Sequence, residues 1–157
     1  MGELSESLVL HVEDNVDDEM LVKRALRHDV PPNRLVAARD GREAAEYLFE
    51  RKLLAGLNEH RLPDLIILDL KLPILGGLEL LERIRSTPET MRIPVVVLSS
   101  SDEVRDVERC YQLGVNSYVP KPVDFDKFLE TVKRIGNYWL DTNRTPWSVM
   151  SFVSILM

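Results

Sequence analysis

The sequence predicts an α/β fold: a doubly wound parallel sheet of five strands, with five helices on its two faces. Short, nearly continuous apolar runs alternate along the chain with charged segments in which apolar residues recur at helical spacing. Such alternation indicates βαβ units, a parallel sheet and helices on both of its faces. The composition, 45% hydrophobic and 29% charged over 157 residues, is that of a globular domain and excludes disordered and coiled-coil classes.

The predicted strands are apolar on both faces, as expected for strands buried in a parallel sheet. They span residues 8–12, 35–38, 65–70, 94–98 and 117–119. Each is followed by a segment of helical periodicity, and these helices are expected at 17–27, around 44–49, around 78–84, at 102–113 and at 124–140. We expect Asp102 to cap the fourth helix and Gly114 to end it.

Residues 51–63 leave two alternatives open. Leu53, Leu54 and Leu57 could extend the second helix, whereas Gly56 and Pro63 favour a connecting segment.

Charge and cysteine content restrict the possible partners and the compartment. The formal net charge of −6 argues against a general nucleic-acid binder, because phosphate binding needs a basic face. Cys110 is the one cysteine, so no intrachain disulfide forms and a reducing compartment is expected. No apolar run reaches the ~18 residues that span a bilayer. We therefore expect a cytoplasmic protein with no membrane or direct nucleic-acid partner.

Polar residues follow four of the five predicted strands. Glu13 and Asp14 follow the first strand, Asp69 ends the third, Ser99 follows the fourth and Lys121 follows the fifth. The carboxyl ends of parallel strands meet at one edge of a sheet, so these side chains are expected to converge. Three close carboxylates repel one another, and a hard divalent cation removes that repulsion.

The residue types at this edge suit Mg²⁺, with Mn²⁺ as the alternative. Asp14, Asp69 and the backbone carbonyl of Lys71 offer the oxygen ligands that Mg²⁺ prefers, with Glu13 contributing through water. An aspartate carboxylate is also a nucleophile that forms aspartyl phosphate. In that reaction, positioning and charge neutralisation supply most of the catalysis.

Four motifs resemble the receiver domain of the response regulators of two-component signalling. They are Val-Glu-Asp-Asn at 12–15, Leu-Asp-Leu-Lys-Leu-Pro at 68–73 with Gly-Gly at 76–77, Leu-Ser-Ser-Ser at 98–101, and Tyr-Val-Pro-Lys-Pro at 118–122. Each motif alone is weak, but all four occur in order, and each lies at a strand end. The resemblance covers residues 7–140, which we take as the receiver domain, and implies a flavodoxin-like sheet in the order 2-1-3-4-5.

The resemblance also implies roles for individual residues. Asp69 would be the phosphoacceptor, and Glu13 and Asp14 the acidic pair that binds Mg²⁺ together with the Lys71 carbonyl. Lys121 would tie the phosphoryl group to the last loop. Pro122 suggests a cis peptide bond between Lys121 and Pro122.

Two further residues are implied to respond to phosphorylation. Ser99 would follow the phosphoryl group, and the rotamer of Tyr118 would report its presence. The expected result is a changed protein-interaction face on the fourth helix, fifth strand and fifth helix.

The implied function is that of a single-domain response regulator, not an enzyme, that accepts a phosphoryl group from a sensor histidine kinase on Asp69 and slowly hydrolyses it. The Tyr-Trp-Leu sequence at 138–140 and the long segment after the second helix resemble the regulators that partner bacterial and cyanobacterial phytochromes. Two alternatives remain: a receiver-fold interaction module that works without phosphorylation, and an aspartyl-phosphate phosphatase. The phosphatase would need an acidic residue where Lys71 stands.

The last 17 residues, 141–157, form an apolar extension after the receiver domain. A segment this apolar is expected to be covered. It could dock on a second subunit as a dimerisation arm, which we expect, or pack on its own domain.

Overall fold

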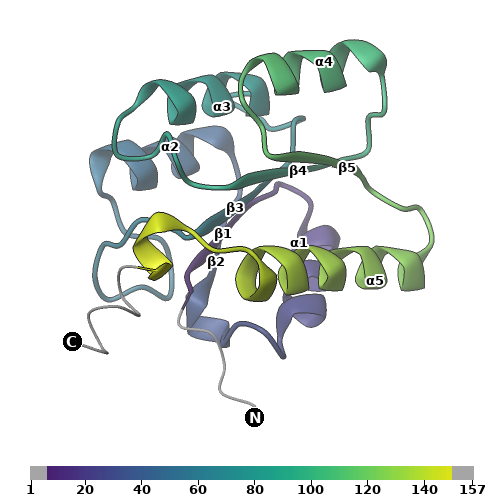
Figure 1. The fold of residues 1–157 in the computed structure, drawn as a ribbon, viewed down its shortest axis with the longest axis horizontal. Helices are drawn as coiled ribbons and strands as arrows, with labels where there is room; N and C mark the ends of the chain where they lie inside the picture. Colours follow the sequence, from purple (N-terminus) through teal and green to yellow (C-terminus); the bar gives the residue numbers. More distant parts are fainter. Residues whose placement is uncertain (1–6, 150–157) are drawn as a thin grey trace.

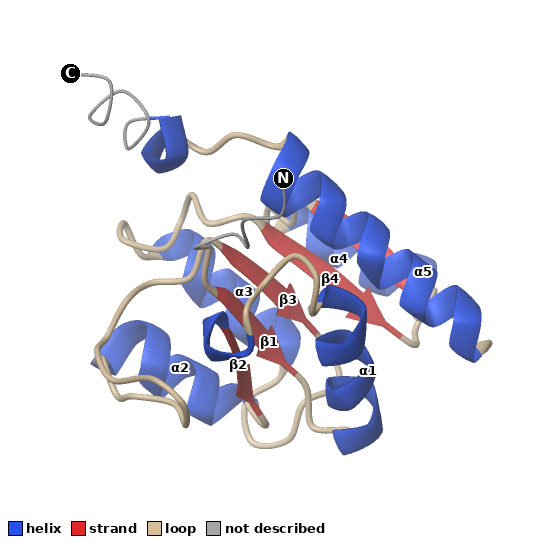
Figure 2. Cartoon of the chain, turned by 90° about the horizontal axis from the view of Figure 1, so that it is seen from below, coloured by secondary structure: helices blue, strands red, loops and turns tan. Residues whose placement is uncertain are grey.

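The computed structural model describes residues 7–149 and contains a parallel sheet between two layers of helices (Figures 1 and 2). The strands are β1 (Val9–Val12), β2 (Leu35–Ala38), β3 (Leu65–Leu68), β4 (Val95–Ser99) and β5 (Ser117–Pro120). All pairings are parallel, and the strand order is β2-β1-β3-β4-β5. The predicted flavodoxin-like fold is therefore confirmed.

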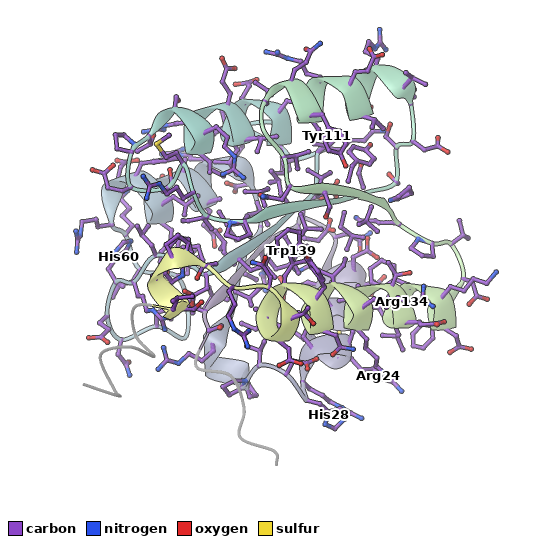
Figure 3. The ribbon with its side chains drawn as sticks, viewed as in Figure 1. Arg24, His28, His60, Tyr111, Arg134 and Trp139 are labelled. Carbon is purple, nitrogen blue, oxygen red and sulfur yellow. The ribbon has the colours of Figure 1, made fainter. Side chains whose placement is uncertain are left out.

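Two helices cover one face of the sheet and three cover the other. The first layer holds α1 (Val16–Leu26) and α5 (Phe125–Gly136), and the second holds α2 (Gly41–Glu50), α3 (Gly77–Ser86) and α4 (Val104–Gln112). Tyr111 of α4 and Arg134 of α5 are both exposed side chains (Figure 3). The chain also contains a 3₁₀ turn, η1 (Pro32–Arg34), and a π-helical segment, η2 (Asn137–Thr142), and residues 146–149 are helical.

The register of β1 and β3 determines where the polar residues that follow these strands lie. Every residue of β1 and β3 is buried, which agrees with their unbroken apolar sequence. Val12 pairs with Ala38 on one side and Leu68 on the other, and the Asp69 amide donates to the Val12 carbonyl at 3.1 Å. The residues that follow β1 and β3 therefore leave the sheet side by side.

Gly77 allows α3 to start close behind the end of β3. A Cβ atom there would lie 2.4 Å from the Asp69 carbonyl oxygen and 2.6 Å from the Leu70 Cα. Both neighbours are backbone atoms, so neither can move without displacing the loop that carries Asp69. The Gly77 amide also donates to the Leu70 carbonyl at 3.0 Å.

Two local expectations need correction or completion. Residues 7–149 contain no cis peptide bond, so the expected cis bond between Lys121 and Pro122 is wrong. With this bond trans, the Lys121 amide donates to the Ser99 carbonyl at 2.7 Å and extends the pairing of β4 with β5. Between α2 and β3 the described chain is a connecting segment, without a helix.

The fourth helix begins one residue later than predicted. Glu103 occupies the N-cap position in place of Asp102, and its side chain makes no capping hydrogen bond. The Ser101 hydroxyl accepts a hydrogen bond from the Glu103 amide and contacts Asp106 at 2.6 Å. The last helix is α-helical to Gly136 and continues as the π-helical η2 to Thr142.

The start of the C-terminal extension packs on its own domain. The Trp147 side chain lies against the core under α2 and α3, and its Nε1 donates to Asp64 Oδ1 at 2.9 Å. The predicted arm continues into residues 150–157, which lie outside the described residues. No helix within residues 7–149 is both long and apolar enough to cross a bilayer.

Substituting Gly77 tests the close approach of α3 to β3. We expect Gly77→Ala to lower the free energy of unfolding by about 1–3 kcal/mol, because the added methyl group overlaps backbone atoms. Gly76→Ala is the matched control, since a Cβ at that position meets nothing closer than 3.9 Å. Urea denaturation of both variants measures the difference, and equal losses would contradict the packing argument.

Candidate functional site

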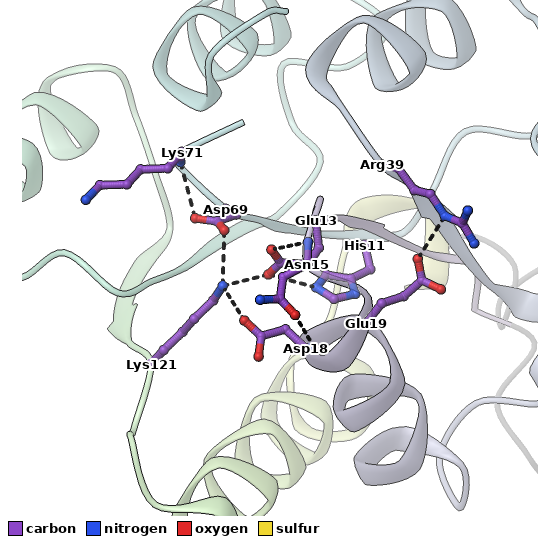
Figure 4. A network of polar contacts seen from close by, with 9 residues as sticks. All are labelled: His11, Glu13, Asn15, Asp18, Glu19, Arg39, Asp69, Lys71 and Lys121. Atoms are coloured by element: carbon purple, nitrogen blue, oxygen red, sulfur yellow. Dashed lines mark hydrogen bonds and ion pairs between the residues drawn. The ribbon is translucent and has the colours of Figure 1, made fainter. Parts of the chain in front are cut away.

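Four side chains from strand ends converge at the carboxyl edge of the sheet, and Figure 4 shows three of them, Glu13, Asp69 and Lys121. Carboxylate oxygens of Glu13, Asp14 and Asp69 lie within 4.8 Å of one another, which makes these residues a candidate group for a metal ion. Lys121 reaches the same place from the loop after β5 and contacts two of the three. The sequence therefore predicted the members of this cluster and the edge on which it lies.

Asp69 is nearly buried, and each of its carboxylate oxygens accepts one hydrogen bond. Oδ1 accepts from the Lys71 backbone amide at 3.2 Å, and Oδ2 accepts from the Lys121 ammonium at 3.1 Å. An ionised carboxylate oxygen has a further lone pair, so both oxygens keep acceptor capacity. The Lys71 side chain is exposed and extends away from Asp69 (Figure 4).

The Lys121 ammonium makes three short contacts with carboxylates. Its Nζ lies 2.7 Å from Glu13 Oε1, 2.9 Å from Asp18 Oδ2 and 3.1 Å from Asp69 Oδ2. Burial alone would lower the pKa of Lys121, but the hydrogen bonds to Glu13 and Asp18 and the charge of Asp69 hold the pKa above its ordinary value. Lys121 therefore remains a cation at neutral pH.

Glu13 is the most deeply buried carboxyl group of the cluster, at 1% exposure. Burial raises the pKa of Glu13 to about 8; the hydrogen bond from Lys121 opposes this effect, and the charge of Asp69 adds to it. Its Oε2 also accepts from the Asn15 amide at 3.2 Å. Without a cation beyond Lys121, the cluster favours a protonated Glu13.

His11 lies in β1 behind the cluster. Burial, followed by the charge of Lys121, lowers the pKa of His11 to about 3, so the imidazole is neutral at physiological pH. Its Nε2 is 4.0 Å from Glu13 Oε1. His28 and His60 lie elsewhere in the molecule (Figure 3), and the described histidines do not gather into a metal site.

Ser99 and Tyr118 meet at one residue of the loop between β4 and α4. Ser99 is fully buried, and its hydroxyl oxygen accepts from the Ser101 amide at 3.2 Å. The Tyr118 hydroxyl donates to the Ser101 carbonyl. The Ser101 hydroxyl in turn contacts Asp106 in the first turn of α4. Ser101 thus connects both expected switch residues to α4.

Sequence reasoning missed two residues of this arrangement. Asp18 lies in the first turn of α1, three residues after the N-cap Asn15. Asp14 precedes the helix, so no helical spacing in the sequence connects the two aspartates. Ser101 was one of three consecutive serines, and the sequence alone could not show which of them joins Ser99 to Tyr118.

The raised pKa of Glu13 gives a pH-dependent stability difference. A carboxyl group whose pKa is higher in the folded than in the unfolded protein stabilises the fold below its unfolded pKa, and this contribution is lost as the pH rises through the folded value. In metal-free buffer we therefore expect wild type to lose stability relative to Glu13→Gln between about pH 4.5 and pH 8. Urea unfolding at several pH values measures the difference in unfolding free energy between the two proteins. A constant difference between pH 4.5 and pH 8 would refute the raised pKa of Glu13.

Comparison with known proteins gives the family. The family model described as "Response regulator receiver domain" matches residues 9–133. The probable methanogenesis regulatory protein FilR2 of Methanothrix harundinacea (strain 6Ac) is 40% identical over 139 residues, which cover 88% of this chain and 87% of FilR2. Response regulator Rcp1 of Synechocystis sp. is 37% identical, over 88% of this chain and 92% of its own.

Solved structures agree with these sequence relatives. The phosphorylated cyanobacterial phytochrome response regulator RcpA superposes with a TM-score of 0.81 and 41% identity, over 89% of this chain and 98% of RcpA. The Mn²⁺-bound form of Rcp1 superposes with a TM-score of 0.79 and 36% identity, over 89% and 99% of the two chains. The predicted resemblance is confirmed: the chain belongs to the response regulator receiver family and is homologous to cyanobacterial phytochrome response regulators.

Proposed function

We propose that this response regulator accepts a phosphoryl group on Asp69 from a sensor histidine kinase and thereby changes its protein-interaction face. The observation that carries this proposal is the environment of Asp69. Its carboxylate is held between the Lys71 amide and the Lys121 ammonium, beside the carboxylates of Glu13 and Asp14. A nucleophile, a fixed cation and oxygen ligands for a metal ion therefore occupy one edge of the sheet.

The transfer step follows from the hydrogen bonds of Asp69. A carboxylate oxygen uses a free lone pair to form a P–O bond, and the P–N bond of a phosphohistidine breaks, with its electron pair remaining on the imidazole nitrogen. Lys121 is placed to donate to a phosphoryl oxygen and to neutralise part of its charge. The Lys71 amide keeps the carboxylate oriented during the attack.

The cluster is chemically suited to a divalent cation. Hard cations such as Mg²⁺ and Mn²⁺ prefer oxygen ligands, and Glu13, Asp14 and Asp69 supply three carboxylates, with the Lys71 carbonyl as a further candidate. Asp14 is exposed, so an ion can reach the cluster from solvent. When bound, the ion supplies positive charge against the carboxylates and the incoming phosphoryl oxygens. The Mn²⁺-bound structure of Rcp1 supports this assignment.

The signal would leave the site through the β4–α4 loop. A phosphoryl group on Asp69 attracts a hydroxyl donor, and the buried Ser99 is the nearest candidate by its place at the end of β4. Movement of Ser99 disturbs its hydrogen bond with the Ser101 amide, and Ser101 holds both Tyr118 and Asp106 of α4. The face built from α4, β5 and α5 therefore responds.

The two alternatives have less support. A phosphatase acting on external substrates needs a general acid two residues after its nucleophile, and Lys71 occupies that position with an exposed side chain. An interaction module independent of phosphorylation would not need the ordered contacts of Asp69. We therefore assign the chain the role of a phosphorylated signalling protein that slowly hydrolyses its own aspartyl phosphate, and not that of an enzyme on external substrates.

The partners we propose are a kinase of the phytochrome class and a second copy of the chain. RcpA, described as a cyanobacterial phytochrome response regulator, supports the first. The apolar sequence of the extension at 141–157 supports the second. We place the protein in the cytoplasm, where such kinases present their phosphohistidine.

Replacing the phosphoacceptor tests the central assignment. Asp69→Asn should abolish phosphorylation by acetyl phosphate in the presence of Mg²⁺, because an amide oxygen is a far weaker nucleophile than a carboxylate. Asp17→Asn is the matched control, since Asp17 is an exposed aspartate on α1. Phosphate-affinity electrophoresis measures the labelled fraction. Undiminished labelling of Asp69→Asn would remove Asp69 from this role.

Truncation tests the arm. Deleting residues 145–157 should convert a homodimer into a monomer, as measured by light scattering with size-exclusion chromatography. The substitution Trp147→Phe separates two effects, because it loses the hydrogen bond to Asp64 but keeps the apolar sequence. An unchanged mass after truncation would refute the arm.

A further inference from the structure

Asp18 is a fourth carboxylate at the site, and it lies outside the candidate metal group. The three residues of that group are Glu13, Asp14 and Asp69. Asp18 instead directs its Oδ2 at the Lys121 ammonium, at 2.9 Å, a shorter contact than the 3.1 Å between Lys121 and Asp69 (Figure 4). Within the site, Asp18 therefore contacts the Lys121 ammonium and not the candidate metal group.

The position of Asp18 is fixed by the start of α1. Asn15 is the N-cap, and its side chain accepts a hydrogen bond from the Asp18 amide at 3.1 Å. An aspartate three residues after the cap is also favoured there by the helix dipole. The ion pair thus connects a rigid first helical turn with the loop after β5.

Lys121 has no spare donor in this arrangement. A lysine ammonium carries three N–H groups, and Glu13, Asp18 and Asp69 are three acceptors. A phosphoryl group on Asp69 brings about two negative charges and new acceptor oxygens close to Nζ. One N–H already faces Asp69, and a second can turn to the phosphoryl oxygens only if the ammonium weakens its contact with Glu13 or Asp18.

The least costly partner to release is Asp18. The Glu13 side chain is 1% exposed, so loss of Lys121 would leave a buried acceptor without its cation. The Asp18 side chain is 24% exposed, so water can take the place of the ammonium. Because Asp18 is more exposed than Glu13, the contact of Lys121 with Asp18 is the one that weakens.

From this geometry we infer that Asp18 is a positioning residue that holds Lys121 on α1 in the unphosphorylated protein and competes with the phosphoryl group for its ammonium. The inference rests on the proposed function of Asp69 and extends it to α1. Asp18 acts through Lys121, so its removal should favour the phosphorylated state and leave the chemistry at Asp69 intact.

The test measures binding of beryllofluoride, a stable mimic of the phosphoryl group, at fixed Mg²⁺ by ¹⁹F NMR titration. Asp18→Asn should lower the dissociation constant about twofold to fivefold, the range expected for a partly exposed ion pair. Asp17→Asn makes the same change of charge and side chain in the same helical turn, and should leave the constant unchanged. Equal constants for wild type and Asp18→Asn would overturn the inference.

A double-mutant cycle separates positioning from general repulsion. Lys121→Gln keeps a polar side chain near Glu13 but removes the ammonium. In that background Asp18→Asn should no longer tighten binding, because its effect passes through Lys121. The same tightening in both backgrounds would show simple charge repulsion and overturn the inference.

The same experiment distinguishes failure of the underlying function. If wild type and Asp17→Asn do not bind beryllofluoride with Mg²⁺, the phosphoacceptor assignment fails, and this inference fails with it. If both bind and Asp18→Asn matches them, the role of Asp18 alone is refuted.

Discussion

Four carboxylates lie around the carboxyl ends of β1 and β3, and the Lys121 ammonium contacts three of them within 3.1 Å. These carboxyl groups sit in a partly buried place, where repulsion between their ionised forms is little screened by water, and burial together with the charge of Asp69 raises the pKa of Glu13. Lys121 offsets part of that repulsion and orients Asp69. The remaining excess of negative charge makes the site receptive to a divalent cation, and the arrival of a phosphoryl group changes the balance again.

The fold positions this charge arrangement through backbone geometry. Pairing of Val12 with Leu68 brings the residues after β1 beside Asp69, and the close start of α3 at Gly77 fixes the loop that carries it. The Lys121 amide donates to the Ser99 carbonyl, so the cation and the expected switch hydroxyl are held by neighbouring strands. A change at Asp69 can therefore reach the β4–α4 loop directly through Lys121 and Ser99.

Much of this arrangement was predictable from the sequence, because it depends on local pattern. Buried parallel strands are recognisable as unbroken apolar runs, and in a parallel sheet the residues after them must share an edge. Asp69, Glu13, Asp14 and Lys121 were placed in this way. The family resemblance supplied the strand order, which periodicity alone left open.

The errors and omissions concern features that depend on three-dimensional contacts. Glu103 stands at the N-cap position of α4 in place of Asp102, and the Ser101 hydroxyl joins this start of the helix by contacting the Glu103 amide and Asp106. Asp18 joins the site because α1 turns its first residues towards the loop after β5. The contact of Asp18 with Lys121 joins residues far apart in the sequence, so only the folded chain shows it.

The most direct test of the account is the chemical identification of the phosphorylated residue. After incubation with acetyl phosphate and Mg²⁺, reduction with borohydride converts an aspartyl phosphate into homoserine, which peptide mass spectrometry locates. If Asp69 is the phosphoacceptor, homoserine appears at position 69 and at no other aspartate. Homoserine at a different position, or a stable phosphate that resists borohydride, would contradict it.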